Sequence, residues 1–435
     1  MNVFIIDDSR KPKDFNDRTF SGYCKKQVFA EFKKALMGSM IESSCYWAVE
    51  LLCSGEVDKI YELFIHIICK IINVNNPRLP YKIYMRYNFF IRIKTYLMGN
   101  ISKKEKDREK TALLRMRNSQ QIRNHICELC VIICLSTKTK GANLVSIKNS
   151  DFSIDNMKAK FGARDDSLIK SVIRYGDPDE AQVVLNEFYY GLKTHKWKIV
   201  VYWLSWILTW EKINIKKDKL YSCGYREINN IDKKYYYDII WFIWEIILKE
   251  SENMENLVNI QIHALYKMYK YEYTPNKKSK KMVLLLCAIK YFTEFYSIHS
   301  NSINDYSLLV RACGRINQLF TNIKEHQVNN IGDDQYKIHK TNYILNNNDP
   351  RKRSKKITVR KIIKEDKDRH QQISESKIIT LDKLDAAFLN RKSNPKEDRI
   401  YSVKEYSNSI KRINNQENGR KIIYDIENII KSNIN

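Results

Sequence analysis

The chain has 435 residues and a formal net charge of +26, and 43% of its residues are hydrophobic. That hydrophobic fraction excludes a wholly disordered chain, and the length allows one large domain or two to three smaller ones. Only 12 Gly and 7 Pro occur, which is too few for the frequent turns of a sandwich or barrel, so the composition favours long helices.

Residues 1–20 are predicted to form an irregular N-terminal arm, followed by a helical body over residues 21–330. Apolar residues recur in the body at spacings of three and four, which is the pattern of an amphipathic helix. The stretch SCYWAVELLCSGE (44–56) predicts a helix that Ser43 or Ser44 caps and that Gly55 ends. The other helices are predicted near 23–36, 56–72, 81–98, 105–135, 165–175, 178–192, 196–211, 232–249, 253–271, 279–298 and 303–323.

These elements predict an all-α fold, in which about a dozen helices form an array or irregular bundle. An alternative divides the body into two subdomains, 21–136 and 160–330, with residues 141–157 as a loop or a short hairpin. Residues 331–435 are polar, Asn-rich and basic, and they are predicted to be a flexible (mobile) basic tail with short helices.

Acidic residues in three places have structural interpretations. Glu42 and Glu50 are predicted to be solvated or paired with neighbouring lysines, whereas the hydrophobic residues beside them are predicted to be buried between helices. Those hydrophobic residues are Trp47, Val49, Leu51 and Leu52. The carboxylates of GARDDS (162–167) and YGDPDE (175–180) are predicted to lie at helix N-termini, where they accept hydrogen bonds from free N–H groups.

The cluster HICELCVIIC (125–134) contains the residue types of a metal site. However, Cys127, Cys130 and Cys134 are three and four positions apart, which follows the apolar stripe of a helix. The chain has no second Cys-x-x-Cys. Core packing is therefore predicted for these thiols, with a metal or redox role as the alternative, and reduced cysteines indicate a cytosol-like compartment.

No phosphate loop, dinucleotide-binding glycine motif, Gly-x-Ser-x-Gly or His-Glu-x-x-His occurs in the chain. The sequence therefore predicts no catalytic residue, no cofactor and no metal ion. We also find no signal peptide and no apolar run long enough to span a bilayer.

Basic segments carry the functional prediction, because a strongly positive protein attracts polyanions. DNA or RNA is the predicted partner, while an AT-rich genome that raises the lysine content is the alternative explanation of the charge. Bases can stack on exposed rings; Trp241 and Trp244 are predicted to be core, whereas the pattern leaves open whether the tyrosines at 266, 269, 271 and 273 are core or stack on bases. The candidate nucleic-acid-binding residues are Arg115, Arg117, Arg123, Lys277, Lys278, Lys280, Lys281, Arg351, Lys352, Arg353, Lys355 and Lys356.

The segment RTFSGYCKKQVFAEFKKALMGSMIESSCYWAVELLCSGEVDKIYELF, followed by NPRLP, resembles a family of uncharacterised proteins of nucleocytoplasmic large DNA viruses, of the algal-virus and mimivirus kind. The resemblance covers residues 18–90 and implies a viral protein. Such a protein acts in the virus factory in the cytoplasm of the infected host cell, in its nucleus, or in the virion. Residues 36–80 are also similar to the helical collar of clamp-loader-type proteins, which implies at most an assembly surface because their ATPase module is missing.

Taken together, the residues and the resemblance predict a non-enzymatic nucleic-acid-associated protein of a large DNA virus. It is expected to act in genome replication, transcription or packaging through non-specific phosphate contacts. The alternative is a helical scaffold that binds acidic protein partners, such as viral replication, transcription or virion proteins. An enzyme remains a third interpretation, because catalytic groups need not form a local motif.

Overall fold

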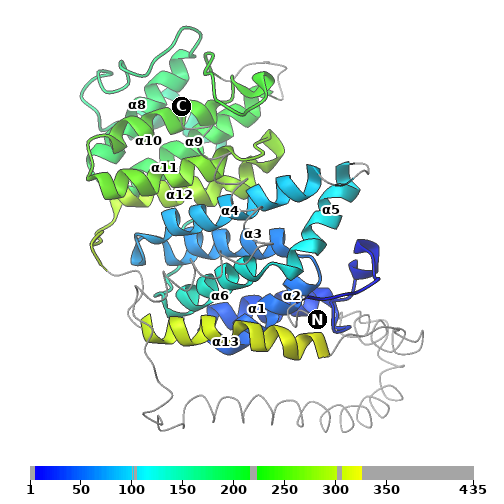
Figure 1. Ribbon diagram of the computed structural model, residues 1–435. Coiled ribbons are helices and arrows are strands. Elements are labelled where there is room, and N and C mark those ends of the chain that lie inside the picture. Colours follow the sequence, from blue (N-terminus) through cyan, green and yellow to red (C-terminus); the bar gives the residue numbers. More distant parts are fainter. Residues whose placement is uncertain (1–4, 100, 102–104, 216–222, 301–305, 326–435) are drawn as a thin grey trace, which may run out of the picture. The chain divides into compact units, whose positions relative to one another are not determined.

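The computed structural model describes residues 5–99, 101, 105–215, 223–300 and 306–325 (Figure 1). In those ranges the chain forms thirteen α-helices and no β-strand, so the predicted all-α fold is confirmed. The helices are α1 Lys25–Met37, α2 Ile41–Cys53, α3 Val57–Ile67, α4 Leu79–Gly99, α5 Glu105–Arg115, α6 Gln120–Leu135, α7 Ile154–Lys158, α8 Asp179–Lys193, α9 Trp197–Ile215, α10 Ile239–Ser251, α11 Asn256–Lys270, α12 Lys278–Thr293 and α13 Tyr306–Glu325. The predicted tail, residues 331–435, lies outside the described residues.

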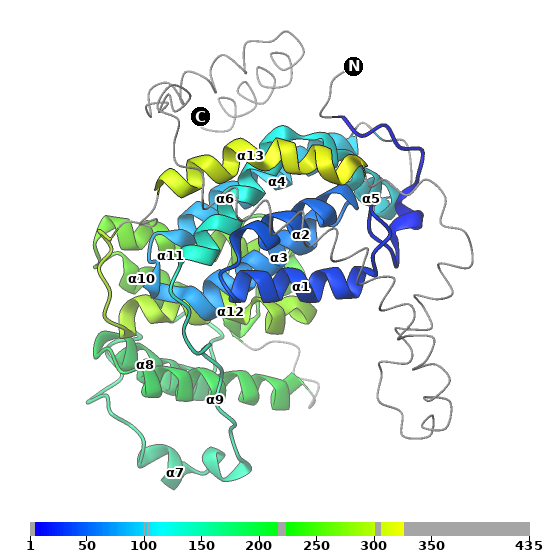
Figure 2. The same cartoon turned by 90° about the horizontal axis from the view of Figure 1, so that it is seen from below.

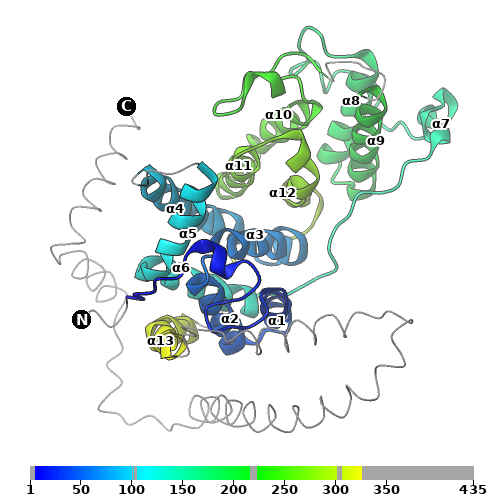
Figure 3. The ribbon, with the colours of Figure 1, turned by 90° about the vertical axis from the view of Figure 1, so that its right-hand side faces the viewer.

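Helices that are distant in the sequence pack against each other in the helical body. Helix α11 lies between α4 and α12 (Figure 3), and α8 forms a helical hairpin with α9 (Figure 2). Helix α13 returns to the N-terminal part of the chain, where it packs on α6 and α2 (Figure 1). None of the described helices is long and apolar enough to cross a membrane.

The stretch 44–56 forms most of helix α2, and the core packs around it. Val49, Leu51 and Leu52 are completely buried, as predicted, whereas Trp47 is only partly buried and packs against the core. The predicted serine cap is wrong, because the helix begins at Ile41 and the Ser44 side chain donates to the Ile41 carbonyl instead.

The ten cysteines are free thiols, and Cys127, Cys130 and Cys134 are buried on α6, which confirms the core packing that their spacing predicted. The sulfur atoms of Cys45 and Cys127 are 3.7 Å apart across the contact of α2 with α6. Within the described ranges, no group of three or more His, Cys, Asp and Glu side chains is placed to hold a metal ion.

The single helix predicted over 105–135 is interrupted at Met116–Asn118, where a 3-10 turn separates α5 from α6. The interruption holds the N-terminal arm, because the Asn118 side chain accepts from the Ile6 N–H at 2.8 Å and donates to the Ile6 carbonyl. Ser119 then caps α6 by accepting from the N–H of Ile122. The arm itself is irregular in the described residues apart from a 3-10 turn at Pro12–Phe15.

The helix predicted over 165–175 is wrong, and turns occupy the segment. Its backbone groups bind side chains of other elements, which replaces the hydrogen bonds that a helix would make. The Asn186 side chain, on α8, accepts from the N–H of Ile169 and donates to the carbonyl of Asp165, and Arg226 donates to the carbonyl of Val172.

The acidic residues of the predicted segment 175–180 have two different roles at the start of α8. Asp179 and Glu180 occupy its first turn, as predicted for a helix N-terminus. Asp177 instead forms a buried ion pair with Arg226, whose two terminal nitrogens lie 2.7 and 2.8 Å from the two carboxylate oxygens. Such a bidentate pair fixes the loop before α8 against the loop that carries Arg226.

The prediction for Glu50 is also wrong, because its side chain is completely buried on α2. The carboxylate accepts from the N–H and from the hydroxyl of Ser21, each at 2.8 Å, so it holds the end of the arm. Burial raises the pKa of Glu50 above its ordinary value of 4.5, although hydrogen bonds from Thr19 and Ser21 oppose this.

Glu50→Ala is expected to reduce the free energy of unfolding by about 2–3 kcal/mol, because it leaves two half-buried donors of Ser21 without an acceptor. Glu50→Gln keeps an acceptor and is expected to cost less. Because the folded protein binds the proton of Glu50 more tightly, wild-type stability falls relative to Glu50→Gln as pH rises from the ordinary pKa of 4.5 through the raised pKa of the folded protein. Urea denaturation of the three proteins across that pH range measures both effects, and a pH-independent difference between wild type and Glu50→Gln contradicts the expectation.

Candidate nucleic-acid interface

The three candidate arginines of the 113–125 segment have different environments. Arg115 is exposed at the end of α5. Arg117 is only 5% exposed and forms an ion pair with Asp8 at 3.3 Å. Arg123 is completely buried, with its guanidinium 4.1 Å from the ring centre of Phe320, and burial lowers its pKa to about 10. The prediction of a shared phosphate surface is therefore wrong for Arg117 and Arg123, which face inward.

The candidate lysines around α12 also divide. Lys277 and Lys280 are exposed, and they form ion pairs with Glu272 at 3.1 Å and with Glu62 at 2.6 Å. Both pairs lie at the surface, where water screens the charges, so both lysines can exchange partners. These two candidates remain available to a polyanion.

Lys278 and Lys281 bind partly buried acceptors of the protein itself, so their predicted role as phosphate-binding residues is corrected. The Lys278 ammonium lies 2.7 Å from Glu211 and 2.6 Å from Asp238, and its side chain is 14% exposed. Lys281 donates to two backbone carbonyls at the end of α11, at 2.7 and 3.0 Å, and burial lowers its pKa to about 8. The last five candidates lie outside the described residues: Arg351, Lys352, Arg353, Lys355 and Lys356.

A groove of about 610 Å³ runs between α4 and α11. We call it the tyrosine groove and define it by the following residues: Tyr84, Tyr87, Asn88, Ile91, Asn229, Asn230, Lys267, Met268, Lys270, Tyr271 and Glu272. A smaller hollow beside it shares four of these residues and is also lined by Lys277 and Lys280. The groove therefore connects to the two candidate lysines that remain available.

The positive charges of the groove come mainly from α11. Lys267 and Lys270 have no ion-pair partner among the described residues, and the Lys267 ammonium lies 5.5 Å from the ring centre of Tyr84. Burial and the neighbouring Lys267 lower the pKa of Lys270. A bound anion would raise this pKa again, because it favours the charged ammonium. Although burial opposes it, Lys277 and Lys94 hold the pKa of Glu272 below its usual range, so this carboxylate is already neutralised by cations.

Tyrosine rings recur along α4, and two of them, Tyr84 and Tyr87, line the groove. Tyr81, Tyr84 and Tyr87 are three positions apart, and the ring centres of Tyr81 and Tyr84 are 6.4 Å apart. Tyr87 contacts Tyr271, the residue that follows α11, edge to face, with ring centres 5.6 Å apart. Burial raises the pKa of Tyr84, Tyr87 and Tyr271, so the phenols stay protonated near neutral pH and can donate hydrogen bonds or stack.

Sequence reasoning found only part of this groove. Of the four tyrosines proposed for stacking, Tyr271 lines it, whereas Tyr269 and Tyr273 are buried. Tyr266 lies beneath Lys270, 4.8 Å from its ammonium. The missed signal is YKIYMRY (81–87), where three tyrosines recur at the spacing that brings side chains to one side of a helix.

Comparisons with protein-family models, with curated proteins and with solved structures find no match to this chain. No relative therefore contributes a ligand or an activity to the interpretation.

Proposed function

We propose that the protein is a non-enzymatic nucleic-acid-associated protein, and that the tyrosine groove binds single-stranded segments. The observation that supports this is the pairing of two lysines without ion-pair partners in the described residues, Lys267 and Lys270, with tyrosine rings along α4. Proteins that bind single strands combine a positive groove with aromatic side chains on which bases stack. The net charge of +26 attracts the polyanion to the protein.

The biological setting in the proposal comes from the resemblance of residues 18–90. It is a large DNA virus, in which the protein acts in genome replication, transcription or packaging, in the infected cell or the virion. Weak sequence preference is expected, because lysine contacts to phosphates carry no base information.

A helical scaffold for acidic proteins is the second candidate function. It is favoured by exposed apolar side chains on α4, since Tyr81 is 41% exposed and Met85 is 46% exposed. Such residues are common where one protein docks on another. Salt-tolerant binding to one protein partner would support this function over the first.

Binding of labelled generic single-stranded and duplex DNA and RNA to the full chain, across a salt series, tests the first proposal. We expect tighter binding to single strands and a linear fall of log affinity with log salt. For three phosphate contacts the slope is about −2 on a single strand. Absence of binding at low salt, or affinity that does not change with salt, contradicts the proposal.

A further inference from the structure

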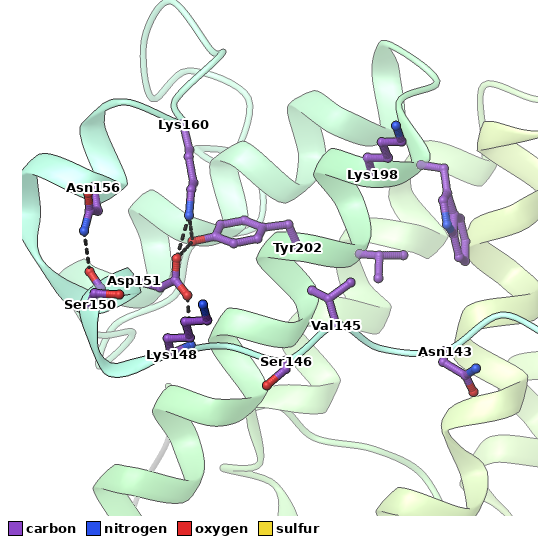
Figure 4. Close-up of a pocket in the computed structure, with 12 residues that line it drawn as sticks. Asn143, Val145, Ser146, Lys148, Ser150, Asp151, Asn156, Lys160, Lys198 and Tyr202 are labelled. Atoms are coloured by element: carbon purple, nitrogen blue, oxygen red, sulfur yellow. Dashed lines mark hydrogen bonds and ion pairs between the residues drawn. The ribbon is translucent and has the colours of Figure 1, made fainter.

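A separate pocket of about 740 Å³ lies beside the first two turns of α9 (Figure 4). Its other wall is the segment 143–160, which contains the short helix α7 and which we call the strap. The volume is within the range of about 300–1,000 Å³ that is usual for small-molecule sites. The tyrosine groove shares no lining residue with it.

The strap is fixed to α9 by hydrogen bonds. The N–H of Val145 donates to the Ser205 hydroxyl at 3.0 Å, and the Trp206 indole donates to the carbonyl of Asp151 at 2.9 Å. Both walls of the pocket are therefore held in place before any ligand arrives, which lowers the entropic cost of binding.

Asp151, Lys160 and Tyr202 form a network at one side of the pocket (Figure 4). The Lys160 ammonium lies 2.6 Å from the Asp151 carboxylate and 2.7 Å from the Tyr202 hydroxyl, which itself donates to Asp151 at 3.1 Å. The hydrogen bond to Asp151 raises the pKa of Lys160, and that from Lys160 lowers the pKa of Asp151. Near neutral pH the network therefore offers a fixed cation, not a base or a nucleophile.

Two further ammonium groups line the pocket, from Lys148 on the strap and Lys198 on α9. Both side chains are exposed, and neither has an ion-pair partner in the described part of the chain. With Lys160, they give three positive charges against the single carboxylate of Asp151, so the lining has an excess of positive charge. The remaining lining includes the indole of Trp197 and several polar side chains: Asn143, Ser146, Ser150 and Asn156.

We infer that this pocket binds a nucleoside phosphomonoester. A phosphomonoester carries a charge of about −1.5 to −2 at pH 7, which complements the excess positive charge of the lining. The ammonium groups of Lys148 and Lys198 lie on opposite sides of the pocket (Figure 4), so they attract the phosphate through the charge of the lining and do not hold it together, and the base packs against Trp197. This chemistry has two sources, a free nucleotide or the phosphorylated end of a strand.

Calorimetry on the full chain with adenosine monophosphate, adenosine and inorganic phosphate tests the inference. We expect the nucleotide to bind more tightly than either part. The double variant Lys148→Met and Lys198→Met is expected to weaken nucleotide binding about tenfold or more, since it removes two of the three positive charges of the lining. The matched control, Lys13→Met with Lys233→Met, changes the net charge equally at two exposed lysines outside the pocket and the strap, and it is expected to have no effect.

Short oligonucleotides with and without a 5′-phosphate identify the source. A gain in affinity from the 5′-phosphate that disappears in the Lys148/Lys198 variant assigns the pocket to strand ends. Its absence, with nucleotide binding retained, assigns the pocket to free nucleotides. Nucleotide binding that is undetectable, or equal in the Lys148/Lys198 variant and its control, overturns the inference. Generic strand binding in the salt series is measured separately and does not depend on this result.

Discussion

Lys278→Met is expected to destabilise the protein by about 3–5 kcal/mol, the usual cost of removing one partner from a buried ion pair. Its ammonium lies between Glu211 and Asp238, whose side chains are only 5% and 8% exposed. Methionine fills a similar volume but leaves the two carboxylates without their cation. Asp238 also caps α10 by accepting from the N–H of Ile240, so the loss extends to the start of that helix.

Chemical denaturation monitored by circular dichroism measures this change, and Lys277→Met is the matched control. Lys277 is the adjacent residue, and both it and its partner Glu272 are about half-exposed. We expect the control to cost at most about 1 kcal/mol, as is typical of surface ion pairs. Equal effects of the two substitutions would contradict the buried role of Lys278.

Replacing Lys267 and Lys270 together by glutamate is expected to weaken single-strand binding about 100-fold at low salt. Two attractive contacts with phosphates become repulsive, and the salt dependence also falls because about 0.7 counterions are released for each phosphate neutralised on a single strand. Fluorescence anisotropy across the salt series measures both the affinity and the slope. The variant with glutamine at both positions tests the loss of attraction without added repulsion, and it is expected to lie between the two.

The matched control for this variant is Lys11→Glu with Lys13→Glu, which changes the net charge equally on the N-terminal arm. Both lysines are exposed there, outside the lining of the tyrosine groove. We expect the control to lose less than about threefold, since distant charges are screened by salt. A similar loss in both variants would mean that overall charge, not the groove, determines the affinity.

Periodicity in the sequence predicted most helices, because each buries one apolar face and the spacing of that face is local information. Two of the errors arose where backbone groups bind side chains from far along the chain. The Asn186 side chain binds backbone groups of the 165–175 segment that a helix would use. The Asn118 side chain, at the break between α5 and α6, binds the backbone of the N-terminal arm. No local pattern contains these partners, so sequence reasoning could not place the breaks.

The sequence predicted less of the candidate site than of the helices, because the partners of its charged side chains also come from distant parts of the chain. Lys277 and Lys278 are neighbours in a basic run, yet one is exposed and the other neutralises buried acids. Only the fold brings Glu211 and Asp238 to Lys278, or Asp8 to Arg117. By contrast, the tyrosine spacing of 81–87 is local and could have been found in the sequence.

The return of α13 to α2 and α6 has a consequence for protein synthesis. Ile316 and Phe320 of α13 are buried there, but a ribosome makes them long after it has completed α6. At the usual rate of about 5–20 residues per second, the delay is on the order of ten to thirty seconds. During that time the nascent chain exposes the apolar surface of α2 and α6 that α13 later covers, which is the kind of surface that chaperones bind.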